Sequence, residues 1–402
     1  MSSQFLELLL AAVGPERPWA GVSAQAEYRP AAGDKVFPPS YPKDPSSSSS
    51  SPKDKNQEEE NPLADSPYLA EVHWVGDKQR WVVVLDQVPS QANRVETALL
   101  EARDEGRIRL PLFELTTSTS RGPVRITSLE MPHRFADAYL RDSQIDGVRF
   151  AKTEVGQKIR SVTARDVRAL FEYSPESLLF GGWDSHRKGH QIRFARAYSS
   201  SIVGLDPRLG RRQGGRMDPV NLTGAVKDST KDDWEFMIPG EKKAKTKGEK
   251  LSERGHGNIA PNPAHGGVSI TGARRAGWLS MAALARLRFG DAPVEAVRLA
   301  RATLAALALA GDRLAFGGPS VWLRSGCDLI HTGQRLVFEG EGQAREEISL
   351  GAGEAIEAFH ELCERTAKAG ITMSQESIAL EPVPALAKAI EYSVAKSDEP
   401  GE

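Results

Sequence analysis

Two kinds of hydrophobic spacing alternate along the chain and predict a mixture of strands and helices. Arg80–Val88 is a run of β-branched residues, which predicts a buried strand ending at Pro89. Apolar residues then recur every three or four positions, which predicts an amphipathic helix. These residues are Ala92, Val95, Leu99 and Ala102. A strand, a capped turn and such a helix are typical of the first half of a split βαβ unit.

The same criteria predict further elements over most of the chain. Predicted strands lie at Arg109–Leu115, Leu178–Trp183, Ile192–Val203, Val321–Leu323 and Arg335–Phe338. Predicted helices lie at His133–Ser143, Thr163–Tyr173, Arg274–Phe289, Ala292–Ala310, Glu354–Ala369 and Pro384–Lys396. Strands and helices in this mixture predict an α+β protein.

The two most apolar runs of the chain lack the features of a signal peptide or a membrane span, which predicts a soluble, cytoplasmic protein. The N-terminal apolar run is short, has no basic leader and is interrupted by Glu7, so it predicts an amphipathic helix and not a signal peptide. The most apolar later run, Ala302–Ala310, is too short to span a bilayer.

Two segments interrupt the periodic pattern. Residues 38–67 contain six consecutive serines and the charge run Lys53–Glu60, a composition that cannot bury enough apolar surface to fold and predicts a disordered linker. Asp206–Gly267 is rich in Gly, Pro, Lys and Arg, and it lacks long apolar periodicity. This second segment predicts an extended insertion that does not fold alone.

Positive charge is concentrated in one stretch of a chain that is slightly acidic overall. The 402 residues include 52 Lys and Arg and 54 Asp and Glu, for a formal net charge of -2. Between Arg187 and Arg216, however, there are eight Lys and Arg and one acid, Asp206. A local basic surface beside strands is what polyanion binding requires, because each cation that meets a phosphate releases counterions. An ordinary solvated hairpin would have the same composition.

A second basic cluster and several aromatic residues extend this picture. Arg121, Arg125, His133 and Arg134 lie just before a predicted helix, whose free N–H groups would favour a phosphate near Met131–Arg134. Trp183, Phe194 and Tyr198 interleave with basic residues, and Trp183 is the best placed to be exposed for base stacking. Gly181 and Gly182 would allow close backbone approach to another strand or to RNA.

The motifs of common enzymes are missing from the sequence. It contains no HExxH, CxxC, GxSxG or lysine-bearing P-loop, and Cys327 and Cys363 are expected to be reduced thiols. His133 and Asp137 are four residues apart, which is a weak signal for a metal or acid–base site. We therefore expect no catalytic residue, no metal and no cofactor. The alternative is an endoribonuclease that uses a histidine or Asp206.

Three unusual strings resemble one protein family. They are SPESLLFGGWDSHRKGHQIRFARAYSSSIVG at Ser174–Gly204, DQVPSQANRVETALLEA at Asp86–Ala102 and TSLEMPHRFADAYLRDS at Thr127–Ser143. They resemble the CRISPR-associated RAMP backbone subunit of type I-G (formerly I-U) Cascade, a ribonucleoprotein of antiviral defence. The resemblance implies a ferredoxin-like or RNA-recognition-like palm whose insertions form a hand-like shape, with several copies lined along a guide RNA and no catalytic role.

The resemblance also implies the partners. They are the CRISPR guide RNA (crRNA), the target DNA strand, further copies of the chain, a large PAM-recognising subunit, an end-capping and RNA-processing subunit, and a helicase-nuclease that is recruited later. Grip on backbone phosphates would tolerate any guide sequence, because base pairing delivers specificity.

The predicted organisation has six parts. They are an N-terminal helix and extended segment (1–37), the linker (38–67), the first part of the palm with inserted helices (68–205), a basic thumb-like insertion (206–267), the second part of the palm (268–350) and C-terminal helices (351–402). The predicted RNA-binding residues are Arg121, Arg125, His133, Arg134, Trp183, His186, Arg187, Lys188, Arg193, Arg196, Arg211, Arg212, Arg216, Lys242 and Lys243.

Overall fold

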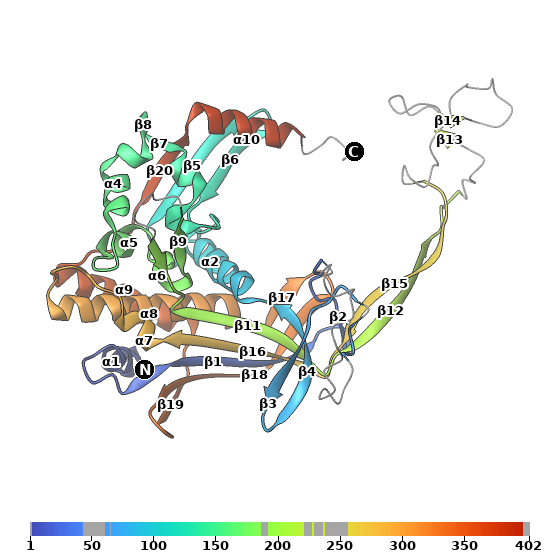
Figure 1. Ribbon diagram of the computed structural model, residues 1–402, viewed down its shortest axis with the longest axis horizontal. Helices are drawn as coiled ribbons and strands as arrows, with labels where there is room; N and C mark the ends of the chain where they lie inside the picture. The colour runs from blue at the N-terminus through green and yellow to red at the C-terminus, as the bar shows by residue number, and fades with distance from the viewer. Residues whose placement is uncertain are drawn as a thin grey trace.

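The chain folds around one large curved sheet that has helices on one face, a lobe above them and an arm at one end (Figure 1). The structure, a computed structural model, describes residues 2–42, 61–64, 66–185, 192–220, 227–228, 236–237 and 256–396. The structure contains both helices and strands, so the predicted α+β class is confirmed. Within these residues, no helix combines the length and apolar character needed to cross a membrane.

The central sheet has eight strands, and each pair of neighbours is antiparallel. Its order is β17 (Ser320–Arg324), β18 (Cys327–Gly340), β1 (Trp19–Pro30), β16 (Gly272–Ser280), β11 (Tyr198–Leu205), β4 (Lys78–Asp86) and β3 (Ala70–Val75), and β19 (Arg345–Ile348) pairs with β18. The structure thus adds β1, from the predicted N-terminal segment, to the middle of the sheet formed by the two predicted palm segments.

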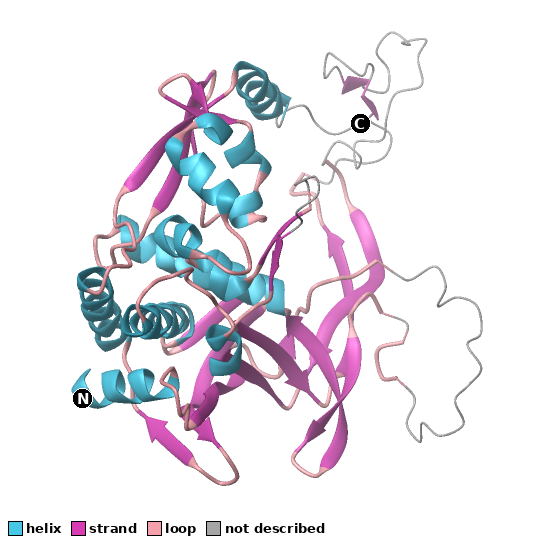
Figure 2. Ribbon diagram, turned by 60° about the vertical axis from the view of Figure 1, so that its left-hand side comes forward, coloured by secondary structure: helices cyan, strands magenta, loops and turns pink. Residues whose placement is uncertain are grey.

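Helices cover one face of this sheet (Figure 1 and Figure 2). They are α1 (Ser2–Ala12), α2 (Val88–Asp104), α6 (Glu176–Phe180), α7 (Met281–Ala285), α8 (Val294–Phe316) and α9 (Ala352–Lys368). The long α8 is buried along most of its length, because α1, α2 and α9 all pack against it. A Cβ atom on Gly311 of α8 would lie 2.6 Å from the Val95 side chain, so this glycine permits the close approach of α2.

The lobe is built on a second sheet that joins distant parts of the chain. Its order is β6 (Gly122–Thr127), β5 (Leu112–Thr119), β20 (Ser377–Pro382), β7 (Ser143–Ile145) and β8 (Val148–Arg149). Short helices surround it: η2 (Arg134–Ala136), α3 (Ala138–Arg141), η3 (Phe150–Lys152), α4 (Glu154–Ser161) and α5 (Arg168–Tyr173), together with the C-terminal α10 (Pro384–Lys396). Because β20 pairs in parallel with β5, the C-terminal segment closes this lobe.

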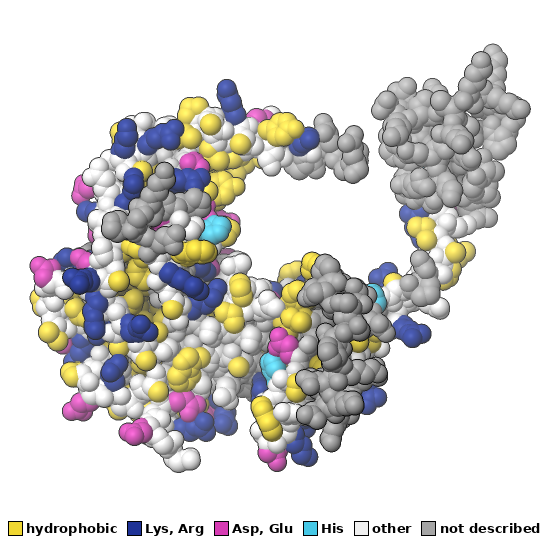
Figure 3. Space-filling view, in the orientation of Figure 1, with side chains coloured by type: hydrophobic (Ala, Val, Ile, Leu, Met, Phe, Trp, Pro, Cys, Tyr) yellow, Lys and Arg dark blue, Asp and Glu magenta, His cyan; other side chains and the backbone are white. Residues whose placement is uncertain are grey.

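The arm is a long two-stranded ribbon that extends from the central sheet. It consists of β12 (Arg208–Arg216) and β15 (Ile259–Ser269), and the short β2 (Lys35–Val36) pairs with β15 at its base. A further short pair is formed by β13 (Lys227–Asp228) and β14 (Phe236–Met237). The space-filling view shows a wide hollow between the lobe, the central body and the arm (Figure 3).

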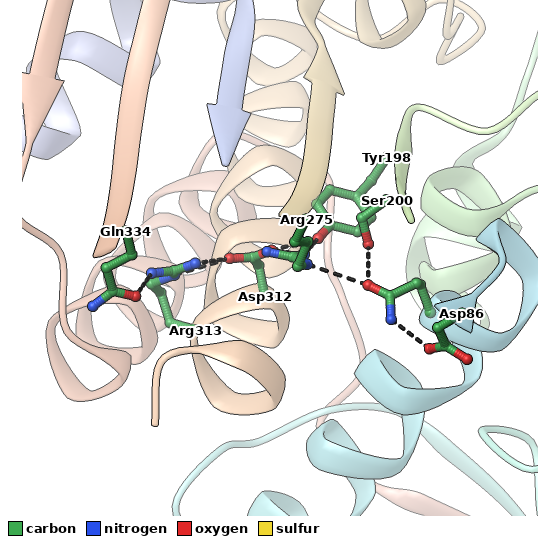
Figure 4. Close-up of polar contacts among 8 residues, drawn as sticks. Asp86, Tyr198, Ser200, Arg275, Asp312, Arg313 and Gln334 are labelled. Atoms are coloured by element: carbon green, nitrogen blue, oxygen red, sulfur yellow. Dashed lines mark hydrogen bonds and ion pairs between the residues drawn. The ribbon is translucent and has the colours of Figure 1, made fainter. Parts of the chain in front are cut away.

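A buried arginine ties the sheet to α8 (Figure 4). Arg275 of β16 is fully buried, and its Nη2 contacts the carboxylate of Asp312 and the hydroxyl of Tyr198. Its guanidinium carbon lies 3.8 Å from the ring centroid of Phe316, a cation–π arrangement. Burial raises the pKa of Asp312, but the charges of Arg275 and Arg313 outweigh burial and hold that pKa well below its ordinary value.

The same polar network continues through α2 to β4 and to β17, which lies at one edge of the sheet. Arg275 Nε donates to Gln91 Oε1 at 3.2 Å, and Gln91 in turn donates to Asp86 at the end of β4. Arg94 binds Asp86 at 2.8 Å and also donates to the carbonyl of Leu323 in β17 at 2.8 Å. Because β17 and β4 lie far apart in the strand order, this contact shows that the sheet curls strongly.

Two predicted elements have the wrong secondary structure. Leu178–Trp183 was predicted as a strand, but its first half belongs to α6, which ends at Phe180, and only Gly182 and Trp183 lie in a strand. Arg274–Phe289 was predicted as a helix, but its first half is β16. The inward positions of β16 include Ala273, Gly277 and the buried Arg275, so small residues and one cation hid the alternation typical of a strand.

Three further predictions were too long. The segment His133–Ser143 contains only η2 and α3, because the Asp137 side chain accepts a hydrogen bond from Tyr139 N and starts a new helix. The predicted helix Thr163–Tyr173 begins only at Arg168. The predicted strand Ile192–Val203 is interrupted between β10 (Ile192–Phe194) and β11. The elements predicted around β4, α2, α8, α9 and α10 are confirmed.

Candidate nucleic-acid interface

Five of the predicted RNA-binding residues meet in one groove. The groove has a volume of about 710 Å³ and lies beside a short hairpin formed by β9 (Gly182–Asp184) and β10. The five residues are His133, Arg134, Trp183, Arg193 and Arg196.

Three of these side chains are available to a ligand. Trp183 is 57% exposed, and it lies opposite Arg193 in the hairpin. Arg193 and Arg196 are both exposed, and neither has an ion pair or a side-chain hydrogen bond within the described part of the chain. An unpaired guanidinium offers up to about five N–H donors to a phosphate, and an exposed indole offers a face on which a base can stack.

Two glycines at the start of the hairpin serve the protein fold. Gly181 has a φ of +87°, and a Cβ atom there would lie 3.1 Å from the carbonyl oxygen of Phe194. A Cβ atom on Gly182 would lie 2.6 Å from the ring of Phe135. Both close contacts are made to other parts of the chain, so these glycines let the hairpin dock against η2.

Arg134 lines the groove, but its guanidinium is engaged within the protein and is not free to bind a phosphate. It is 9% exposed, and its Nε and Nη2 bind both carboxylate oxygens of Glu96 in α2 at 2.6 and 2.9 Å. Its Nη1 donates to the carbonyl of Gly181 at 3.0 Å. This geometry disfavours the predicted phosphate contact, and the helix predicted to begin here is only the three-residue η2.

Two buried carboxylates lie near this arginine. Burial raises the pKa of Glu96, and the hydrogen bonds and charge of Arg134 oppose that effect by favouring the carboxylate. Glu176 of α6 is also buried, and burial raises its pKa to about 7. Its carboxylate accepts a hydrogen bond from Ser174 Oγ. Glu176 does not line the groove itself, but it lies on α6, whose Phe180 does.

His133 and Asp137 form a pair at the rim of the groove. His133 is exposed, and its Nδ1 lies 3.4 Å from a carboxylate oxygen of the buried Asp137. Asp137 also accepts hydrogen bonds from the backbone N–H groups of His133 and Tyr139 at 3.0 and 2.9 Å. The carboxylate thus caps a helix and orients the imidazole, and neither role needs a ligand.

The two remaining cations of the second basic cluster lie on the β5–β6 hairpin of the lobe and are engaged there. Arg125 binds Asp104 at 2.8 Å and Glu114 at 2.6 Å. Arg121 donates to the carbonyl of Ala395 in α10 at 3.0 Å. Their place in the fold gives no support to the predicted RNA contacts.

The arm carries a second set of available cations. Arg208, Arg211 and Arg212 of β12 are exposed and form no side-chain hydrogen bond or ion pair with the described residues, whereas Arg216 donates to the carbonyl of Gly257 at 2.9 Å. Register shifts at Gly210 and Gly215 interrupt the pairing with β15. Such bulges re-aim side chains along a ribbon. Arg208 was not among the predicted residues, although it stands in the same arginine-rich string, RLGRRQGGR.

Several predicted residues lie outside the described residues, so the structure does not place them. They are His186, Arg187, Lys188, Lys242 and Lys243. Most of the predicted linker also falls there.

The residues considered for catalysis have structural partners. The carboxylate of Asp206 accepts hydrogen bonds from Arg80 at 3.2 Å and Thr271 at 2.9 Å, and its φ of +50° fits a turn between β11 and β12. Cys327 and Cys363 are buried, and burial raises their pKa values to about 11 and about 12, so both thiols are protonated. In the described ranges, no group of three or more His, Cys, Asp or Glu could hold a metal ion.

Comparison with known proteins connects the chain to CRISPR systems. Residues 22–208 match the model of a family described as CRISPR-associated protein GSU0053. No curated protein matches the chain. The matched region runs from β1 to the start of the arm, and it includes the groove and the β9–β10 hairpin.

Proposed function

We propose that the chain binds a CRISPR guide RNA independently of its sequence, as the repeated backbone subunit of a type I Cascade complex. The observation that carries this proposal is the groove, where Trp183, Arg193 and Arg196 are exposed together and the two arginines have no acidic partner in the described chain. The match to a CRISPR-associated family supports the same role. Phosphates meet the arginines, and a base stacks on the indole.

The path of the RNA follows the available cations. In the groove these are Arg193 and Arg196, and on the arm they are the exposed arginines of β12. An RNA strand that follows them would run from the groove of the lobe toward the arm. The arm also extends away from the body, as a thumb that reaches a neighbouring copy on the same RNA would.

The strand connections favour a ferredoxin-like palm. Strands β18, β1, β16 and β11 are adjacent in this order and antiparallel, and α2 and α8 lie in the connections from β1 to β11 and from β16 to β18. Numbered along the chain, these strands have the order 4-1-3-2, which is that of a split βαβ pair. We assign them to the palm, with β4, β3 and β17 as additions.

The remaining partners follow from the resemblance in the sequence, and the family match supports a part in a CRISPR system. Further copies of the chain, a large PAM-recognising subunit, an end-capping and RNA-processing subunit, the target DNA strand and a helicase-nuclease are the expected partners. Pairing between guide and target supplies the sequence specificity, and the chain supplies the grip on the guide backbone.

The experiment is charge reversal in the groove. Arg193→Glu with Arg196→Glu should weaken binding of unrelated single-stranded RNAs to a similar extent, because phosphate contacts do not read sequence. The charge-matched control is Arg29→Glu with Arg286→Glu, two exposed arginines outside the groove. Equal loss in both double variants, or loss for only one RNA sequence, would contradict a phosphate-binding groove.

A second candidate function is RNA cleavage, which one observation favours. An exposed histidine oriented by a buried carboxylate, His133 with Asp137, has the arrangement of a general base and lies at the rim of the groove. Labelled RNA incubated with the protein, with and without chelator, should remain intact on a gel. Cleavage that disappears in His133→Ala or Asp206→Asn would favour the enzyme instead.

A further inference from the structure

A separate cavity lies directly beside the groove in the lobe. It has a volume of about 220 Å³ and is formed where η2, α3, η3 and α4 meet the end of β9. Ala136 and Arg141 line both the cavity and the groove, so the two spaces share a wall. None of the roles assigned above uses this cavity.

The walls of the cavity are apolar and include aromatic rings. Phe135, Leu140, Phe150 and Ile159 form its apolar lining, and all four side chains are otherwise buried. Phe135 also contacts the hairpin, because its ring lies 6.1 Å from that of Phe194 in an edge-to-face arrangement. The cavity is thus held by the same ring that positions the groove.

The lining of the cavity includes two acidic and two basic residues. Asp137 and Asp184 contribute carboxylates to the lining, and Asp137 is 3% exposed. Arg141 and Arg160 also line it, and both are exposed, but Arg141 is paired with Asp142 at 2.8 Å. Asp137 accepts two backbone N–H bonds and pairs with the His133 imidazole, and a carboxylate has about four acceptor positions, so one acceptor position remains.

The carboxylates disfavour a phosphate inside the cavity, and the exposed arginine favours a phosphate at the mouth of the cavity. A phosphate among two carboxylates would be repelled, whereas an exposed arginine attracts it. A planar ring that presents an N–H donor could instead bind the remaining acceptor position of Asp137 and pack against the phenylalanine walls. One ligand unites these features: a nucleobase with its own phosphate outside.

We propose that this cavity accepts one unstacked nucleobase of the RNA strand that lies in the groove. The inference rests on the proposed RNA-binding function and deepens it, because it assigns a base-binding pocket to a surface otherwise described as gripping phosphates. Single-stranded RNA is commonly held with bases splayed out and stacked on aromatic side chains. The cavity would bind the base through shape and stacking, and the exposed Arg160 would meet an adjoining phosphate.

The test fills the cavity and follows the bases directly. Ala151 lines the cavity but not the groove, and Ala151→Leu would occupy the space of a base. Ala276→Leu, the same change at an exposed position of β16, is the matched control. The probe is an oligouridine that contains 4-thiouridine at every position, cross-linked by light to the full chain, with the linked peptides identified by mass spectrometry.

Wild type and Ala276→Leu should give cross-links within residues 135–160 as well as at the hairpin. Ala151→Leu should lose the first group of cross-links, keep those at the hairpin and bind the oligouridine roughly tenfold more weakly, which is the worth of one stacked base. Ala151→Met, whose flexible side chain adapts to irregular space, repeats the test if the leucine variant does not fold.

The failures of the two proposals are distinguishable. If the oligouridine does not bind wild type at all, the proposed function fails and the base pocket fails with it. If it binds and cross-links only at the hairpin, with no change in Ala151→Leu, the groove stands and the pocket is overturned. If Ala151→Leu changes only the association of copies, the cavity receives a side chain of a second copy, which also overturns the base pocket.

Discussion

Arginines in two regions of this molecule have opposite environments. In the core, Arg275 and Arg313 are buried and share the carboxylate of Asp312. In the groove, Arg193 and Arg196 are exposed and have no acidic partner within the described chain. A guanidinium that is already paired inside the protein stabilises the fold, whereas an unpaired one on the surface is available to a phosphate. The comparison teaches that availability, and not charge alone, marks the candidate interface.

Tertiary structure determines which arginines have an acidic partner. Arg275 lies on β16 and Asp312 on α8, and Arg134 reaches Glu96 on α2. None of these partners is close in sequence. A basic residue in a string such as Met131–Arg134 therefore resembles one in the hairpin until the fold places its partner.

The largest expected effect is on stability and comes from the core. Asp312→Ala leaves two buried arginines without their carboxylate, and removal of one partner of a buried ion pair costs about 3–5 kcal/mol. Arg193→Ala should change the free energy of unfolding by no more than about 0.5 kcal/mol. Chemical denaturation of both variants measures this difference. Similar losses would mean that the groove arginines also support the fold.

A smaller effect is expected from Glu176 of α6. Its folded pKa of about 7 exceeds the ordinary value of 4.5, so the folded state keeps a proton that the unfolded state loses. The stability linked to this proton is present below pH 4.5 and is lost as the pH rises through about 7. Gln cannot titrate, and its carbonyl oxygen can still accept from Ser174.

Glu176→Gln should therefore melt at nearly the wild-type temperature in acid and above it at pH 8, where the gain is on the order of 3 kcal/mol. Melting curves of the two proteins over this pH range give the difference directly, because the other titrating groups cancel. A difference that does not depend on pH would show that the carboxylate is not neutral in the fold. Glu96 and Arg134, which lie near it, are unchanged in both proteins.

Much of the fold could be predicted from the sequence where the apolar pattern was clean. The β-branched run at Arg80–Val88 and the regular spacing of α8 and α9 were sufficient. The pattern failed at β16, where the buried Arg275 occupies a position that is normally apolar. It also failed at α6, because a short buried run has the same composition in either secondary structure.

The residues of the candidate site could likewise be predicted only in part. Trp183, Arg193 and Arg196 were identified from the interleaving of aromatic and basic residues, and the structure brings them together. Arg134 and Arg125 were chosen on charge, and only the fold reveals their acidic partners. The cavity beside the groove had no sequence signal, because its lining comes from four short helices and the end of a strand.

A moderate effect is expected from the arm, and only in the presence of RNA. Arg211→Gln with Arg212→Gln removes two exposed cations that have no partner in the described chain. For single strands, each lost phosphate contact should flatten the log–log dependence of affinity on salt by about 0.7. Filter binding across a salt series measures this slope. An unchanged slope would remove the arm from the RNA path and leave the groove alone.

The smallest expected effect is at Arg125, which the sequence assigned to RNA. The structure pairs it with Asp104 and Glu114 on the surface of the lobe, where an exposed ion pair is worth about 0–1 kcal/mol. Arg125→Gln should therefore lower stability only slightly and leave both the affinity for RNA and its salt slope unchanged. Arg193→Gln is the matched comparison, because it removes the same charge from a residue without a partner. If Arg125→Gln weakened RNA binding as much as Arg193→Gln, pairing in the free protein would not predict availability, because the ion pair would open to meet the phosphate.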